Sequence, residues 1–284
     1  MQVRDPAVAG SFYPESPEEL RRILKNFLEN LEPKRRKCLG AVAPHAGYEF
    51  CGNTAASVYN NISTGFDTAI ILGPNHSGAG VGVATSLETW KTPLGNLEID
   101  EEFVKCLTKD SVILEDPKSH WREHSIEVQL PWLQYRFKEF KIVPITINPI
   151  YFDVKTCREI GEKIAEITKD LRRKVLIIAS SDFTHYGPMY GYEPFDGSSN
   201  EIIKKIREMD YEVIRLITSL KPAEVIETCD EKRLTICGYG GIAAMLFAAK
   251  ILGAKQGELI DYSTSFDISK NTDAIVGYAG ILIY

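Results

Sequence analysis

Apolar residues follow two patterns along the 284 residues of this chain. Continuous apolar runs, typical of strands covered on both faces, occur at 39–43, 68–72, 141–147 and 174–179. Helical spacing predicts helices near 52–62, 100–108, 125–139, 154–170, 198–219 and 239–252, after an earlier one through Leu20, Ile23, Leu24, Phe27 and Leu31. This alternation predicts an α/β fold with a central, partly parallel sheet between two layers of helices.

The C-terminal part of the chain changes pattern. Residues 257–265 and 274–283 predict two strands joined by the polar loop DISKNTD, and therefore an antiparallel edge on the sheet. The chain has no internal repeat, low-complexity tract or linker-like segment. We therefore expect a single three-layer α/β/α domain over 1–284 with a mixed sheet.

Composition limits the function classes. A net charge of -6 argues against nucleic acid as a partner, because a phosphate-binding face needs clustered Lys and Arg. No apolar stretch reaches the ~18 residues of a membrane span, and the start MQVRDPAVAG lacks the apolar core of a signal peptide. The six cysteines contain no CxxC pair, which argues against a zinc ribbon or a thioredoxin-type site, and without an export signal we expect them in a reducing compartment. We expect a cytoplasmic protein that acts on a small molecule or a peptide, without membrane insertion.

Three of the five histidines occupy equivalent places. His45, His76 and His185 each lie shortly after a predicted core strand, in a turn that contains Gly or Pro. In open α/β sheets ligands bind outside the carboxyl ends of the strands. A single histidine of this kind usually makes one ordinary hydrogen bond, but three in equivalent positions predict a shared pocket.

Cys237 extends this candidate pocket. It closes the run RLTIC and precedes GYGGIAAMLFAAKIL, which reads as a tightly packed helix. A thiol at a helix N-terminus is expected to have a lowered pKa, which favours the thiolate that binds metal or attacks a substrate. The alternative is a buried core cysteine. Asp182, three residues before His185, would orient that imidazole or cap the next turn.

The segment HWREH at 120–124 matches the H-x-x-E-H pattern of certain zinc peptidases. That pattern requires both histidines on one face of a formed helix. Here apolar periodicity begins only after His124, and Asp116-Pro117 breaks the chain upstream. We therefore expect His124 and Glu127 to start a helix and to point towards the pocket.

Seven motifs in order resemble the Memo family, which takes its name from a mediator of cell motility in vertebrates. They are AGSFYP, APHAGYEFCG, ILGPNHSG, TPLGNLEID, EHSIEVQLPWL, SSDFTHYG and TICG, and the resemblance runs from about residue 5 to the C-terminus. The Memo fold is similar to that of class III extradiol dioxygenases, which use non-haem iron. The resemblance implies that His45, His76 and Cys237 stand at the metal-ligand positions, with His185 as acid/base beside Asp182.

The same resemblance implies that His124 and Glu127 line or support the pocket. Cys237 replaces the carboxylate ligand of the dioxygenases, and a thiolate shifts metal preference towards copper, zinc or a more electron-rich iron. Iron is the expected metal, with copper or zinc as alternatives.

Three functions compete at this point. The first is a metal-dependent oxidoreductase, and the second is a binding module that holds a peptide or a small anionic ligand in the same pocket. The third is a hydrolase with Cys237 as nucleophile and His185 as base. We favour the metal because the third alternative leaves two histidines without a role.

Overall fold

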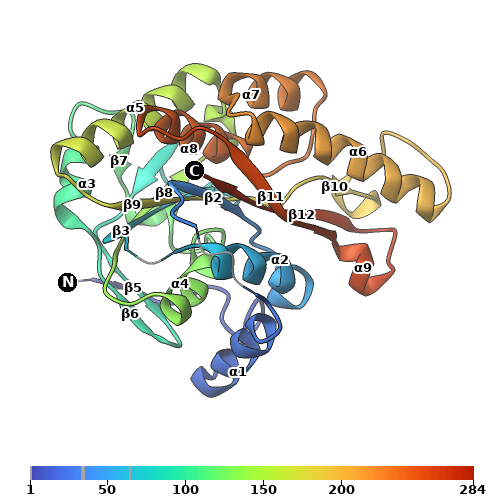
Figure 1. The fold of residues 1–284 in the computed structure, drawn as a ribbon, viewed down its shortest axis with the longest axis horizontal. Helices are drawn as coiled ribbons and strands as arrows, with labels where there is room; N and C mark the ends of the chain where they lie inside the picture. The colour runs from blue at the N-terminus through green and yellow to red at the C-terminus, as the bar shows by residue number, and fades with distance from the viewer. Residues whose placement is uncertain (1, 33–35, 64) are drawn as a thin grey trace.

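The four apolar runs form neighbouring strands at the centre of a mixed sheet (Figure 1). The structure, a computed structural model, describes residues 2–32, 36–63 and 65–284. The strands in these ranges are β1 (Val3–Arg4), β2 (Gly40–Ala43), β3 (Thr68–Pro74), β4 (Val83–Thr85), β5 (Thr89–Thr92), β6 (Gly95–Leu97), β7 (Leu114–Glu115), β8 (Lys141–Ile147), β9 (Val175–Ser180), β10 (His185–Tyr186), β11 (Gly257–Thr264) and β12 (Ile275–Ile283).

Within the described residues the main sheet has the order β10-β12-β2-β9-β3-β8-β4-β7, and β11 also pairs with β12. Strands β2, β9, β3 and β8 run parallel, whereas β12 is antiparallel to β2, β10 and β11, and β4 is antiparallel to β8. Strands β1, β5 and β6 form a separate small sheet. The expected mixed sheet with an antiparallel C-terminal edge is confirmed.

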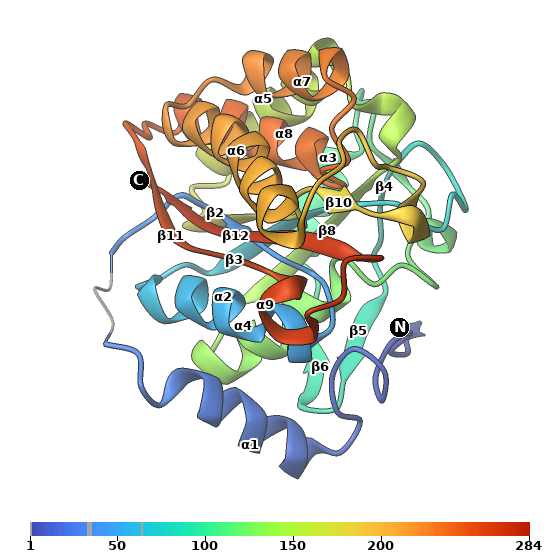
Figure 2. The same ribbon diagram turned by 90° about the vertical axis from the view of Figure 1, so that its right-hand side faces the viewer.

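Helices cover both faces of the main sheet (Figures 1 and 2). Helices α5 to α8 lie on one face, and α1, α2 and α4 lie on the other. The α-helices are α1 (Pro17–Leu28), α2 (Tyr48–Asn61), α3 (Glu101–Leu107), α4 (Leu130–Arg136), α5 (Val154–Asp170), α6 (Ser199–Thr218), α7 (Pro222–Glu231), α8 (Tyr239–Ile251) and α9 (Ser265–Ser269). Single 3₁₀ turns are η1 (Pro117–Ser119), η2 (Glu127–Gln129), η3 (Pro149–Tyr151) and η4 (Pro188–Tyr190).

Two segments differ from their sequence-based prediction. The expected helix at 125–139 is a 3₁₀ turn followed by the short α4, because Pro131 fits only the first turn of an α-helix. The polar segment DISKNTD is not wholly a loop, since α9 begins before it. Thr264 and Asp267 form a capping box there, in which each side chain bonds the other's backbone N–H.

Strand topology brings the predicted pocket residues to one edge of the sheet. Strand β9 lies between β2 and β3, and all three are parallel. His45 follows the end of β2 by two residues, His76 follows β3 by two, and Asp182 follows β9 by two. The carboxyl ends of three adjacent strands therefore carry these side chains. Among the described residues no helix has the length and apolar character of a membrane span.

Candidate metal centre

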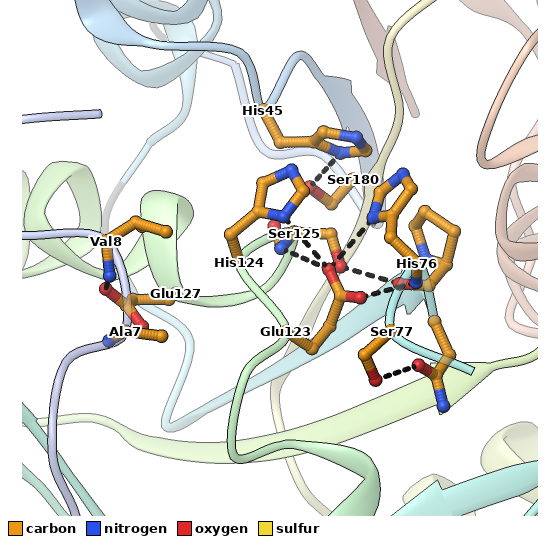
Figure 3. Close-up of polar contacts among 12 residues, drawn as sticks. Ala7, Val8, His45, His76, Ser77, Glu123, His124, Ser125, Glu127 and Ser180 are labelled. Atoms are coloured by element: carbon orange, nitrogen blue, oxygen red, sulfur yellow. Dashed lines mark hydrogen bonds and ion pairs between the residues drawn. The ribbon is translucent and has the colours of Figure 1, made fainter. Parts of the chain in front are cut away.

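Three imidazoles converge at this edge of the sheet (Figure 3). His45 and His76 come from the strand ends, and His124 comes from the irregular segment between η1 and η2. Their ring centroids lie 5.2 Å apart for His45 and His76, 5.4 Å for His45 and His124, and 4.7 Å for His76 and His124. One ring nitrogen of each lies within 4.8 Å of the others.

Ser180, the last residue of β9, fixes the tautomer of His45 (Figure 3). Its hydroxyl donates to the carbonyl of Ser125 at 2.6 Å and accepts from Nε2 of Gln129 at 2.7 Å. The only hydroxyl hydrogen is thus used, so Nδ1 of His45, 3.1 Å from the same oxygen, must donate. Nε2 of His45 is left without a proton and faces the pocket.

Glu123 likewise determines which ring nitrogen of His76 donates a hydrogen bond (Figure 3). Its carboxylate accepts from the backbone N–H of His76 at 2.5 Å, from Nδ1 of His76 at 3.0 Å and from the N–H of Ser125 at 2.8 Å. Burial alone would raise the pKa of Glu123, but the hydrogen bond and charge of His76 bring it to about 2. An ionised carboxylate only accepts, so Nδ1 of His76 carries a proton, and in the neutral ring Nε2 is the nitrogen open to a metal ion.

Burial keeps two of the imidazoles, those of His45 and His124, neutral. It lowers the pKa of His45 well below its ordinary value, with a further contribution from the neighbouring His76. It also lowers the pKa of His124 to about 4. Neutral imidazole is the form of histidine that binds metal ions.

Cys237 reaches the cluster from the turn before α8. Its Sγ lies 3.2 Å from Nε2 of His45 and accepts from the backbone N–H of Asp182 at 3.3 Å. A Cβ on Gly238 would lie 2.6 Å from the carbonyl oxygen of Ser180, so only glycine lets this turn approach β9. The expected low pKa is wrong, because burial, with the charge of Asp182, raises the pKa of the Cys237 thiol well above its ordinary value. In the metal-free protein the thiol is protonated and donates to His45.

His185 stands at the wall of the same pocket. Its Nδ1 lies 2.9 Å from the carbonyl oxygens of both Phe183 and Thr235, so Nδ1 donates and Nε2 is the nitrogen that can take up or release a proton. These carbonyls hold the ring, whereas Asp182 accepts from the backbone N–H of His45 at 2.8 Å. Burial raises the pKa of Asp182, against the opposing charge of His185. Asp182 thus positions the His45 loop.

The pocket has a volume of about 390 Å³. The histidines form one end, and neutral polar groups of the α9 region form another. No Lys or Arg is among its described lining residues, which besides His45, His76, His124, His185 and Asp182 are Phe12, Ala46, Gly47, Phe50, Tyr190, Ser265, Ser269, Asn271, Ala274, Val276 and Tyr278. The walls are therefore mostly apolar and aromatic, as in small-molecule sites.

Comparison with known proteins places the chain in a family. A family model described as Memo-like protein matches residues 4–282. The chain belongs to the Memo family. It is 44% identical over 282 residues to a MEMO1 family protein of Methanosarcina barkeri, with 99% of this chain and 100% of the relative covered. A MEMO1 family protein of Thermococcus kodakarensis is 43% identical over 290 residues, with 99% of each chain covered.

One solved structure supports the fold. An uncharacterized protein from Escherichia coli K12, JW3007, superposes with a TM-score of 0.50 at 10% identity. The match covers 86% of this chain and 99% of that one. At this identity the likeness concerns the fold alone.

Sequence reasoning about this Memo-family chain missed three side chains that arrange the cluster. Glu123 was considered only as part of the H-x-x-E-H pattern, and Ser180 and Gln129 were not singled out. In the sequence, these residues stand out only by position: Glu123 lies beside His124, and Ser180 lies at the end of a strand. The peptidase pattern itself does not form, because residues 120–124 are not helical and His120 is buried edge-on against Trp90, 5.6 Å away.

The donor set fits a transition metal. Imidazole suits iron, copper, zinc and nickel, and a thiol beside the cluster adds a soft donor. Bonds of about 2.0–2.1 Å in a tetrahedral site place two ligand nitrogens about 3.4 Å apart, so nitrogens that now lie within 4.8 Å would have to approach by up to about 1.5 Å. The group of His45, His76 and His124 could therefore hold a metal ion.

Proposed function

We propose that this Memo-family protein is a metal-dependent oxidoreductase acting on a small molecule. The observation that carries the proposal is the set of three converging imidazoles, two of which have their Nδ1 protons fixed so that Nε2 is bare. Hydrogen bonding of the outer ring nitrogen is the usual support of a histidine ligand. His45 and His76 would hold the ion, with Cys237 as the expected third ligand and His124 as the competing one.

Iron is the metal we propose first, with copper or zinc as alternatives. Bound there, it would supply redox or Lewis-acid chemistry. His185 would take or return a proton at its bare Nε2, since the carbonyls of Phe183 and Thr235 keep its other nitrogen protonated. Phe12, Phe50 and Tyr190 would exclude water around the ligand.

A binding module remains the second candidate, because the candidate donor atoms already have hydrogen-bond partners within the protein. The Cys237 thiol occupies Nε2 of His45, and Glu123 pairs with His76. A cysteine hydrolase has less support. The imidazole in contact with the thiol is His45, and burial raises the pKa of Cys237.

Elemental analysis of protein purified anaerobically without a histidine tag tests the proposal. We expect about one metal ion per chain, lost in His45→Ala and His76→Ala. Cys237→Ala and His124→Ala then identify the third ligand. His120→Phe is the control, because this imidazole is buried against Trp90 outside the cluster and its loss should leave the metal in place. Wild-type protein that stays metal-free after addition of Fe(II), Cu(I) and Zn(II) would contradict the oxidoreductase and favour the binding module.

A further inference from the structure

The carboxylate of Glu127 lies behind His124 and is fully buried. Its Oε2 accepts from Nη1 of Arg4 and from the N–H of Ala7, both at 2.7 Å. Its Oε1 accepts from the N–H of Val8 at 3.0 Å and from the hydroxyl of Tyr13 at 2.6 Å. Four donors fill the lone-pair sites of the carboxylate, and all four belong to residues 4–13, which we call the N-terminal arm (Figure 3 shows Ala7 and Val8).

Arg4 ties the arm to the segment that carries the cluster. Its Nε donates to the carbonyl of His120 at 2.8 Å, and its Nη2 donates to the carbonyl of Glu123 at 2.6 Å. With the ion pair to Glu127, one guanidinium bonds three points of the segment 120–127. The guanidinium also lies over the ring of Trp90, 4.0 Å from its centroid.

The segment 120–126 has no helix or strand of its own to fix it. Besides a few main-chain turns, side chains hold its backbone, and one of the two carbonyls that Arg4 binds belongs to Glu123, the residue directly before His124. A lysine in place of Arg4 could not reproduce this arrangement, because a single ammonium lacks the planar fork that bonds separate acceptors.

The arm also forms one wall around His124. The Phe12 ring packs against the imidazole of His124 with centroids 4.8 Å apart. The backbone N–H of Tyr48 donates to the carbonyl of Phe12 at 2.8 Å, which anchors the arm to the start of α2. Burial, followed by the charge of Glu127, raises the pKa of Tyr13, so its hydroxyl remains a donor.

We infer that Arg4 and Glu127 are positioning residues that set the geometry of Glu123 and His124 through the N-terminal arm. They touch none of the candidate ligand atoms. The inference rests on the proposed metal site for its affinity readout, but the arrangement of the imidazoles can be measured without a metal.

The test uses the full chain with Arg4→Gln, Arg4→Lys, Glu127→Gln and Tyr13→Phe. The control is Arg36→Gln, which removes a more exposed contact of the same kind outside the pocket lining, since Arg36 pairs with Glu258 and lies 5.1 Å from the ring of Tyr284. Long-range ¹H–¹⁵N NMR of the metal-free protein reports the tautomers of His76 and His124, and titration with Co(II) reports affinity and coordination spectrum.

We expect about a ten-fold loss of Co(II) affinity in Arg4→Gln and Glu127→Gln, the lower end of the effect of residues that orient metal ligands. Their His76 and His124 ring signals should broaden or split. Arg4→Lys should recover thermal stability better than affinity. Tyr13→Phe removes one donor and keeps the ring, so it should give a smaller loss in the same direction, even where a stronger variant does not fold.

The possible outcomes separate the proposed function from the inference about Arg4 and Glu127. Wild-type protein that binds no Co(II) contradicts the proposed function, while the metal-free ring signals still test the inference. Variants that melt earlier but keep wild-type affinity and ring signals give Arg4 and Glu127 a purely structural role, which would overturn the inference.

Discussion

Hydrogen-bond acceptors outside the pocket determine which nitrogen each imidazole offers to it. Ser180, Glu123 and the carbonyls of Phe183 and Thr235 each accept a hydrogen bond from an Nδ1 atom, which leaves Nε2 of His45, His76 and His185 as the nitrogen open to a metal ion or a proton. Any metal ion held at this site would therefore depend on residues that do not themselves belong to the group of candidate ligands.

Ser180→Ala tests this dependence. The change leaves Nδ1 of His45 and Nε2 of Gln129 without their common acceptor in a buried site. We expect a 10–100-fold loss of metal affinity and about 1–3 kcal/mol of stability. Isothermal titration with Co(II) and urea unfolding measure the two effects.

Ser111→Ala serves as the control, because its hydroxyl accepts only from the nearby N–H of Ile113. It should leave affinity unchanged. An unaltered Co(II) affinity in Ser180→Ala would show that the tautomer of His45 does not need this serine.

Helices and strands approach so closely in places that only glycine fits. A Cβ on Gly161 of α5 would lie 2.6 Å from the carbonyl oxygen of Ala244 and from Cβ of Phe247, both in α8. Helix α8 is buried along most of its length, with small residues facing the sheet and α5. This close contact keeps α8, and with it the Cys237 turn at its N-terminal end, against the sheet.

Gly161→Ala sets two effects against each other. Alanine favours helix over glycine by about 1 kcal/mol, but overpacking against a neighbouring backbone costs about 1–3 kcal/mol. Because the clash involves backbone atoms that cannot move freely, we expect a net loss of about 1–2 kcal/mol in urea unfolding. Glu162→Ala, on the exposed side of the same helix, should change stability little. Stabilisation by Gly161→Ala would mean that the two helices separate readily.

Asp210 links α6 to the C-terminal strands through a buried carboxyl. It accepts from the hydroxyl and N–H of Thr184 and from the hydroxyl of Tyr262. Burial raises the pKa of Asp210 from 3.8 to about 6, although these hydrogen bonds oppose the change. The folded state therefore binds this proton more tightly than the unfolded state does.

The stability due to that proton is fully present below pH 3.8 and is lost as the pH rises through about 6. The difference corresponds to about 3 kcal/mol at pH 7. Asp210→Asn lacks this titration, so the unfolding free energy of the wild type, relative to the variant, should fall by about that amount between pH 4 and 7. Urea unfolding at several pH values measures it. Parallel profiles for the two proteins would contradict a raised pKa.

Much of this architecture follows from patterns within single segments. The strand at 141–147 and the helix at 154–170 were predicted at their observed bounds, because continuous apolar runs and helical periodicity are local properties. The carboxyl ends of parallel strands meet at one edge of a sheet, and this rule predicted that His45 and His76 share a pocket. Short strands such as β4 and β10 contain too few residues for an apolar pattern to predict them. The prediction of one domain over the full chain stays a prediction.

What could not be predicted depends on contacts between distant residues. His124 was expected beside the pocket, and the structure places it within the histidine cluster because Arg4, 120 positions earlier, holds the preceding carbonyl. Glu123 becomes the partner of His76 only once the segment folds back on β3. Burial of Cys237 likewise reverses the pKa expected from its place at a helix N-terminus.

Since the pocket joins three strand ends, the 120–127 segment and the α8 turn, an ion bound there should stabilise the fold as a unit. A ligand present at about 100 times its Kd adds about 2.7 kcal/mol to the free energy of unfolding. For a chain of this size that corresponds to a rise of about 5–10 °C in melting temperature. We expect this rise when chelator-treated protein is reloaded with Fe(II) or Zn(II) and followed by calorimetry. His120→Phe should keep the rise and His45→Ala should lose it. A rise of equal size in His45→Ala would place the bound metal elsewhere on the chain.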